Sequence, residues 1–225
     1  LADPAPETVA EADNWRAMPP ETAITEMVKA GRNIIVSGGT STGKTTFLNL
    51  LIEHIPDHHR VLTVQDTAEL EVKHTDANHY FGPRIPHPTG ITYGEIFDHL
   101  MRSRPDIIIA GEVSEINVLN TIKLMATGHR GFMTTIHSSS VGEVLNRAFQ
   151  KRGNTAGHQF IDLTATLHEE IDLIIQLVRD LSTGKRRIVQ IYSPTLDHWF
   201  YGRPANFEEA KCTRPPYARF LPSWS

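Results

Sequence analysis

The chain has 225 residues, of which 40% are hydrophobic and 21% charged, and its formal net charge is -4. These values are ordinary for a globular protein, and from them we expect neither direct binding to nucleic acid nor a membrane-spanning run of ~20 apolar residues. The single cysteine, Cys212, excludes an internal disulfide framework and a zinc site built from several cysteines.

The two ends of the chain differ in composition from the part between them. Residues 1–20 are rich in Ala, Pro, Asp and Glu, which predicts a linker or the remnant of a preceding domain. The chain begins at Leu1 rather than at Met, which favours the remnant. Residues 194–225 combine Pro, aromatic and basic residues, which predicts an irregular C-terminal tail. We therefore expect the regular domain over residues 21–193.

Between these ends, apolar runs suited to strands alternate with stretches suited to helices. We predict helices at residues 21–30, 44–55, 93–103, 115–127, 141–151 and 157–168. We predict strands at residues 33–37, 60–65, 106–111, 131–137, 171–179 and 186–192. Nearly continuous apolar strands that alternate with helices are typical of a parallel sheet covered on both faces. The predicted fold is α/β, a mostly parallel sheet flanked by helices, with the last two strands added as an antiparallel hairpin.

Residues with special roles at helix ends support these boundaries. Thr92 with Glu95, and Ser140 with Glu143, have the spacing of capping boxes, in which side chains satisfy the free backbone N–H groups of the first helical turn. Gly128 stands where a helix should end, because glycine readily adopts the left-handed conformation that closes a helix.

One segment carries a recognisable binding motif. It reads Gly-Gly-Thr-Ser-Thr-Gly-Lys-Thr-Thr, fits G-x-x-x-x-G-K-[ST], and lies between a predicted strand and a predicted helix. Glycines let backbone N–H groups close around an anion, and the N-terminus of the following helix adds a favourable dipole. Lys44 is expected to reach the β- and γ-phosphates of ATP, and the Thr45 hydroxyl to hold Mg²⁺. The predicted nucleotide-binding residues are Gly38, Gly39, Thr40, Ser41, Thr42, Gly43, Lys44, Thr45 and Thr46.

Two later strands end in acidic residues. Asp66 and Glu69 follow the strand at 60–65, and Glu112 follows the apolar run at 107–110. Parallel strands present such residues to a ligand crevice at their carboxyl ends. Glu112 is predicted to hold Mg²⁺ or to orient the attacking water. Asp66 and Glu69 either share that role or belong to a solvated turn.

A third strand ends in Thr134-Thr135-Ile136-His137. It would bring a titratable imidazole to the same edge, where the ring can hydrogen-bond a phosphate or a polarised water. Taken alone, this pattern is more typical of a structural histidine at a strand end than of a catalytic one.

The order of these four segments resembles the secretion ATPase superfamily, and most of all the VirB-type traffic ATPases of bacterial type IV secretion systems. The resemblance covers residues 30–192. It implies a RecA-like P-loop ATPase domain that assembles as a homo-hexamer. It also implies a cytoplasmic protein at the inner face of the bacterial inner membrane, with inner-membrane components of the secretion apparatus as partners. The implied substrate is a secreted protein or a protein–DNA complex.

The resemblance assigns roles to residues outside the phosphate loop. Asp66 and Glu69 match acids of the family's Asp box, Glu112 matches the glutamate of its second phosphate-binding motif, and His129 and His137 match its histidine box. It thus implies catalytic roles for Lys44, Glu112, Asp66, Glu69 and His137, and Mg²⁺ ligands in Thr45 and Glu112.

The chain departs from the family pattern at two positions. Many relatives have Glu, a proposed general base, where this chain has Gln65. An amide can orient water but cannot take its proton, which moves the base role toward Glu112 or Glu69. Many relatives also have Arg where this chain has Ser114, and the family's separate N-terminal domain, which supplies further arginines, is expected to be largely missing.

Two other functions fit the same sequence. A pilus retraction motor of the same superfamily would carry the same motifs, whereas the single cysteine argues against relatives with a four-cysteine zinc module. A nucleotide-binding scaffold with little hydrolysis would fit the departures at Gln65 and Ser114.

Overall fold

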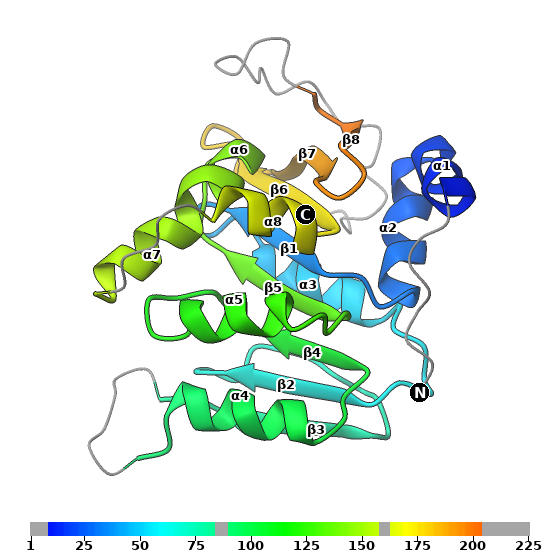
Figure 1. Ribbon diagram of the computed structural model, residues 1–225. Helices are drawn as coiled ribbons and strands as arrows, with labels where there is room; N and C mark the ends of the chain where they lie inside the picture. The colour runs from blue at the N-terminus through cyan, green and yellow to red at the C-terminus, as the bar shows by residue number, and fades with distance from the viewer. Residues whose placement is uncertain (1–8, 84–89, 158–162, 204–225) are drawn as a thin grey trace.

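The computed structural model describes residues 9–83, 90–157 and 163–203 (Figure 1). Within these ranges the chain forms an eight-stranded sheet with the order β3-β2-β4-β5-β1-β6-β7-β8. The first six strands in this order, from β3 through β2, β4, β5 and β1 to β6, are parallel to one another. Strands β7 and β8 each pair antiparallel with the strand before them. The strands are β1 Ile34–Gly38, β2 Val61–Gln65, β3 Ala77–Phe81, β4 Ile107–Ala110, β5 Phe132–Ile136, β6 Leu173–Arg179, β7 Arg186–Ser193 and β8 His198–Tyr201.

Helices cover both faces of the sheet, which gives the chain two apolar layers (Figure 1). One layer packs under α1, α2 and α3, and the other under α4, α5, α8 and the segment from α6 to α7. The helices are α1 Val9–Ala17, α2 Pro20–Lys29, α3 Lys44–Ile52, α4 Tyr93–Arg102, α5 Val118–Ala126, α6 Val141–Glu143, the π-helical turn η1 Val144–Ala148, α7 Phe149–Thr155 and α8 Thr164–Glu170.

Four adjacent inner strands explain the predicted α/β class. Every residue of β1, β2, β4 and β5 is buried. Strands covered on both faces are mostly apolar without strict alternation, and these four, whose few polar residues are also buried, follow that pattern. The predicted mostly parallel sheet with a C-terminal antiparallel hairpin is confirmed, since β6 and β7 pair antiparallel across the turn at residues 180–185.

Three elements lie where the sequence predicted none. Strand β3 is an edge strand whose residues are exposed or half-buried, and it lacks the apolar pattern of the inner strands. Strand β8 falls in the segment predicted as irregular, and that prediction is wrong for His198–Tyr201, which pair with β7. Helix α1 falls in the predicted linker, where Trp15 is buried against Arg32. The rest of the predicted tail, from residue 204, lies outside the described residues.

The helix ends follow the predicted capping chemistry in part. Thr92 and Glu95 form the complete predicted capping box at α4. At α6 the Ser140 hydroxyl accepts the Glu143 N–H, but the Glu143 carboxylate turns back to Ser138 and Ser139 instead of closing the box. The predicted helix at 141–151 exists, but the π-helical turn η1 interrupts it.

Candidate active site

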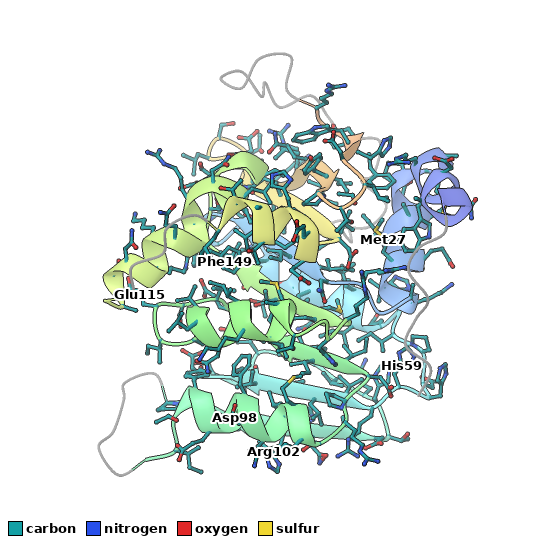
Figure 2. All side chains as sticks on the ribbon, in the orientation of Figure 1. Met27, His59, Asp98, Arg102, Glu115 and Phe149 are labelled. Carbon is teal, nitrogen blue, oxygen red and sulfur yellow. The ribbon has the colours of Figure 1, made fainter. Side chains whose placement is uncertain are left out.

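The loops that follow β1, β2, β4 and β5 meet at one edge of the sheet, because these strands are neighbours or near neighbours and run parallel. Figure 2 shows Glu115, which follows β4, on the side toward which the parallel strands point. His59, which precedes β2, lies on the opposite side. The carboxyl edge of an open parallel sheet is where ligands bind in such folds.

The phosphate loop connects β1 to α3 and has the backbone that an anion needs. Gly43 precedes α3 with φ 87°, a left-handed conformation. A Cβ at Gly43 would lie 2.9 Å from Arg186 Cδ, and one at Gly38 would lie 2.5 Å from Thr42 Oγ1. The loop also ties itself together, because Thr42 Oγ1 donates to Gly39 O at 2.9 Å. These contacts leave no room for side chains, so the backbone itself lines the cradle.

Lys44 joins this loop to a second one. Its Nζ donates to Gly39 O at 3.1 Å and lies 3.3 Å from Nδ1 of His137, at the end of β5. Nε2 of His137 lies 3.1 Å from Oε1 of Glu112, at the end of β4. A Lys ammonium can only donate, so Nδ1 accepts and Nε2 carries the proton given to Glu112. The three side chains thus form one connected chain across the edge of the sheet.

Burial changes the proton affinities of Lys44 and His137. The pKa of Lys44 is lowered by burial, an effect that the nearby Glu112 carboxylate partly offsets. The pKa of His137 is also lowered, first by burial, with Glu112 opposing and the cations Lys44 and Arg152 reinforcing. A lowered pKa keeps the ring neutral at physiological pH, as the bond from Lys44 to Nδ1 requires.

The loop after β2 is shaped by Gln65. Its Oε1 accepts the N–H groups of Glu69 at 2.9 Å and Leu70 at 3.0 Å, so the loop folds back over the strand end. Asn49, on α3, donates from Nδ2 to Glu69 O at 2.9 Å and accepts from Glu71 N. These hydrogen bonds hold the loop that carries Asp66 and Glu69 against α3, the helix that follows the phosphate loop.

The acids of this loop face Glu112 across a cavity. A cavity of about 120 Å³ is lined by Thr45, Asp66, Glu69 and Glu112, among others. A larger cavity of about 600 Å³ shares Asp66 and Glu112 with it and extends to His137. The predicted acids therefore share one site with the Thr45 hydroxyl and His137.

The residues fit a divalent cation that arrives with a nucleotide. In the described parts of the chain, no group of three or more His, Cys, Asp or Glu side chains gathers into a metal cage. Mg²⁺ rarely uses such cages and is typically held by one or two protein oxygens together with substrate phosphates. Thr45 and Glu112, on one cavity, supply oxygens of this kind.

The comparison with known protein families identifies the chain's relatives. The family model described as "Type II/IV secretion system protein" matches residues 18–214, most of the chain. The chain belongs to this family. The resemblance to secretion ATPases that the four motifs predicted is confirmed.

Individual members of the type II/IV secretion system protein family align over much of this chain. The conjugal transfer protein TrbB of Rhizobium radiobacter is 32% identical over 196 residues, which is 84% of this chain and 57% of TrbB. The type IV secretion system protein VirB11 of Bartonella quintana is 28% identical over 173 residues, which is 75% of this chain and 48% of VirB11. The chain of 225 residues thus spans about half the length of the curated relatives it matches.

A solved structure shares the fold. The VirB11 ATPase from the Brucella suis type IV secretion system, crystallised in complex with sulphate, matches with a TM-score of 0.68 at 22% identity. The match covers 84% of this chain and 55% of that one. At this identity the similarity shows the fold, and the predicted RecA-like fold is confirmed.

The family's histidine box is divided by the structure. His137 lies in the site, but His129 precedes β5 and lies near Asp106, which precedes β4, at the opposite edge of the sheet. Arg102 and Arg104 also precede β4. These three residues therefore do not join the phosphate loop within this chain.

One site residue was missed by sequence reasoning. Lys151 and Arg152 form a short basic run, a pattern typical of a solvated surface, yet the Arg152 side chain is half-buried and lines the larger cavity with Glu112 and His137. Its position depends on the π-helical turn just before α7, and no periodicity in the sequence reveals that turn.

None of the helices in the described part of the protein is long and apolar enough to cross a bilayer.

Proposed function

We propose that this protein hydrolyses ATP to ADP and phosphate with Mg²⁺, and that the reaction powers substrate translocation or apparatus assembly in a bacterial type IV secretion or conjugal transfer system. One observation carries the proposal. The phosphate-loop Lys44, the strand-end His137 and Glu112 form a connected chain of polar contacts at the carboxyl edge of the sheet. Membership of the secretion protein family supports it.

The residues of the site have separable tasks. Lys44 is held by the Gly39 carbonyl inside its own loop, so its ammonium is oriented before a nucleotide binds. The bare loop backbone and the N-terminus of α3 bind the phosphates. In phosphoryl transfer, positioning and electrostatic stabilisation carry nearly all of the rate enhancement. The preoriented ammonium of Lys44 is suited to that task.

Thr45 and Glu112 are the residues proposed to hold Mg²⁺, Thr45 through its hydroxyl and Glu112 through a water of the ion's shell. The ion, when bound, would neutralise charge that develops on the phosphates. Asp66 and Glu69, on the same cavity, are placed to hydrogen-bond water in its shell. This role is proposed for them in preference to a purely solvated turn, since the loop that carries them is tied to α3 by Asn49.

Glu112 is the proposed general base. A carboxylate accepts hydrogen bonds at both oxygens, and the bond from His137 to Oε1 leaves Oε2 to take a proton from water. Gln65 cannot replace it, because an amide takes no proton and its Oε1 already accepts two backbone N–H groups. His137, bonded to both Lys44 and Glu112, is placed to respond to the γ-phosphate.

The assembly and its partners belong to the same proposal. The protein would act as a homo-hexamer at the cytoplasmic face of the bacterial inner membrane, with inner-membrane components of the apparatus as partners. Its cargo would be a secreted protein or a protein–DNA complex. The names of the relatives, conjugal transfer protein and type IV secretion system protein, support this setting.

Steady-state ATP hydrolysis at several protein concentrations tests the proposal. We expect Lys44→Ala to abolish turnover and Glu112→Gln to bind ATP yet hydrolyse it about 10²-fold more slowly. Lys123→Ala, on the exposed face of α5, is the matched control. Turnover per chain that rises with protein concentration, together with a ring-sized mass in the presence of ATP, would support hydrolysis at subunit interfaces. Wild-type turnover in Lys44→Ala would overturn the assignment.

A scaffold that binds ATP with little hydrolysis is the second candidate, and the observation that favours it is Gln65. This residue lies at a strand end, on the cavity proposed to hold Mg²⁺, and its side chain holds the shape of the following loop, which leaves it unsuited to proton transfer. Tight ATP binding without turnover at every protein concentration would select the scaffold.

A further inference from the structure

The end of β4 and the end of β5 are joined by a side chain from α7. The Arg152 guanidinium donates from Nε to Val113 O at 2.9 Å and from Nη2 to His137 O at 3.1 Å. Val113 comes directly after Glu112, so one bond fixes the backbone beside Glu112 and the other fixes the backbone of His137. The two bonds span 39 and 15 positions of sequence respectively.

The Arg152 side chain is itself held in place. Its Nη1 donates to Ala148 O at 3.0 Å, and Ala148 is the last residue of the π-helical turn η1. A π-helical turn adds a residue to the helix and rotates the next helical segment about the axis, and such turns are often found at functional sites. The turn η1 therefore sets the rotation of α7 that directs Arg152 toward the strand ends.

The electrostatic surroundings favour a charged group at this position. Three carboxylates, those of Glu112, Glu115 and Glu143, lie near enough to stabilise the guanidinium, although burial lowers the Arg152 pKa. The guanidinium is planar with its donors in a fixed fork, so it can hold two carbonyl groups at a set separation. A lysine ammonium cannot reproduce that fork.

We propose that Arg152 is a positioning residue for ATP hydrolysis, which holds the ends of β4 and β5 so that Glu112 and His137 stay in hydrogen-bond contact. The inference rests on the proposed ATPase function, since it assigns the residue to that same site. Arg152 touches neither the phosphate loop nor Lys44 in the described contacts. It therefore acts on the hydrolytic step rather than on nucleotide affinity.

Kinetics of Arg152→Gln test this role. We expect kcat to fall by about tenfold or more, because small misplacements of catalytic groups are costly, while the Kd for a non-hydrolysable ATP analogue changes by less than about twofold. Arg152→Lys keeps the charge but loses the fork, so its kcat should stay near that of Arg152→Gln. Lys123→Gln, which removes a charge from an exposed position on α5, should match the wild type. Full activity in Arg152→Lys, or equal losses in kcat and affinity in Arg152→Gln, would overturn the proposal.

A measurement without turnover separates this proposal from the ATPase assignment. In ¹⁵N spectra of histidine-labelled protein at fixed pH, the His137 ring nitrogens, assigned with His137→Gln, report which nitrogen carries the proton. Arg152→Lys, which keeps the positive charge near the ring but loses the fork, should shift these signals, and Lys123→Gln should leave them unchanged. An unchanged His137 signature in a folded Arg152→Lys variant would overturn the positioning role, even if the wild type hydrolyses ATP. A shifted signature in a protein without turnover would reject the ATPase and keep the contact.

Discussion

Nζ of Lys44 and Nδ1 of His137 are 3.3 Å apart, although 93 positions of sequence separate the two residues. The contact places the imidazole between the cation of the phosphate loop and the carboxylate of Glu112, its partner on the other ring nitrogen. Because a neutral ring can accept on one side and donate on the other, it can pass a change at one end to the other. His137 is the link that makes the separate strand ends into one site.

His137→Ala removes that link. We expect kcat for ATP to fall between about tenfold and 10²-fold, because Glu112 loses the group that orients it, while nucleotide affinity, which the loop backbone supplies, changes little. Single-turnover hydrolysis and analogue binding, measured on the same preparation, check this. A His137→Ala variant with wild-type kcat would reduce the residue to the structural histidine that its sequence pattern alone favours.

Variants of Gln65 can distinguish the structural role of this residue in the loop after β2 from a role in proton transfer. In Gln65→Glu the carboxylate can accept the same two N–H groups from Glu69 and Leu70, so we expect an intact loop and a turnover equal to or above that of the wild type. Gln65→Ala removes the acceptor of both N–H groups and should lower the free energy of unfolding by about 1–3 kcal/mol, because two hydrogen bonds worth about 0.5–1.5 kcal/mol each are lost. Urea denaturation and kcat distinguish the two. Equal behaviour of both variants would contradict this role.

The core of the sheet gives a matched pair for stability. Leu62, in β2, is fully buried, whereas Leu181, in the turn between β6 and β7, is 94% exposed. The same change to Ala should cost about 2–5 kcal/mol at Leu62, from lost burial and the cavity left behind, and close to nothing at Leu181. Urea unfolding curves with a common slope test it. Similar costs at both positions would show that β2 is not part of the core.

Glu143 gives stability a specific dependence on pH. Hydrogen bonds from Ser139, at 2.6 Å from its hydroxyl, and from Ser138 lower the pKa of this carboxyl below 4.5. The folded state therefore favours the charged form, and its stabilising effect is present above pH 4.5 and lost as pH falls through the lowered pKa. The stability gap between wild type and Glu143→Gln should shrink below about pH 4.5. A gap that stays constant from about pH 7 to about pH 3 would contradict this.

Strand and helix order could be predicted because local chemistry decides it. The inner strands are mostly apolar, and Thr92, Gly128 and Gly43 adopt the conformations that their residue types favour. Strand β3 was not predictable in this way, since an edge strand is held by backbone pairing with β2 and needs no apolar face.

The site could be predicted only as far as strand ends reveal it. Parallel strands bring Asp66, Glu112 and His137 to one edge, and the sequence shows where each strand stops. Arg152 enters from a helix whose rotation depends on a π-helical turn, and no local pattern encodes that rotation. The separation of His129 from His137 is a matter of strand length, because β5 lies between them and carries them to opposite edges.

The order of strands in the sheet has a consequence for folding during synthesis on the ribosome. Strand β1, which carries the phosphate loop, pairs only with β5 and β6 in the described chain, so its partners are synthesised about a hundred residues later. The loop also rests on Arg186, whose Nε donates to Ser41 O across 145 positions of sequence. A nascent chain that stops before β6 would hold the whole nucleotide motif and still lack the frame that shapes it. The ability to hold a nucleotide should therefore emerge only after β6 and Arg186 have been synthesised.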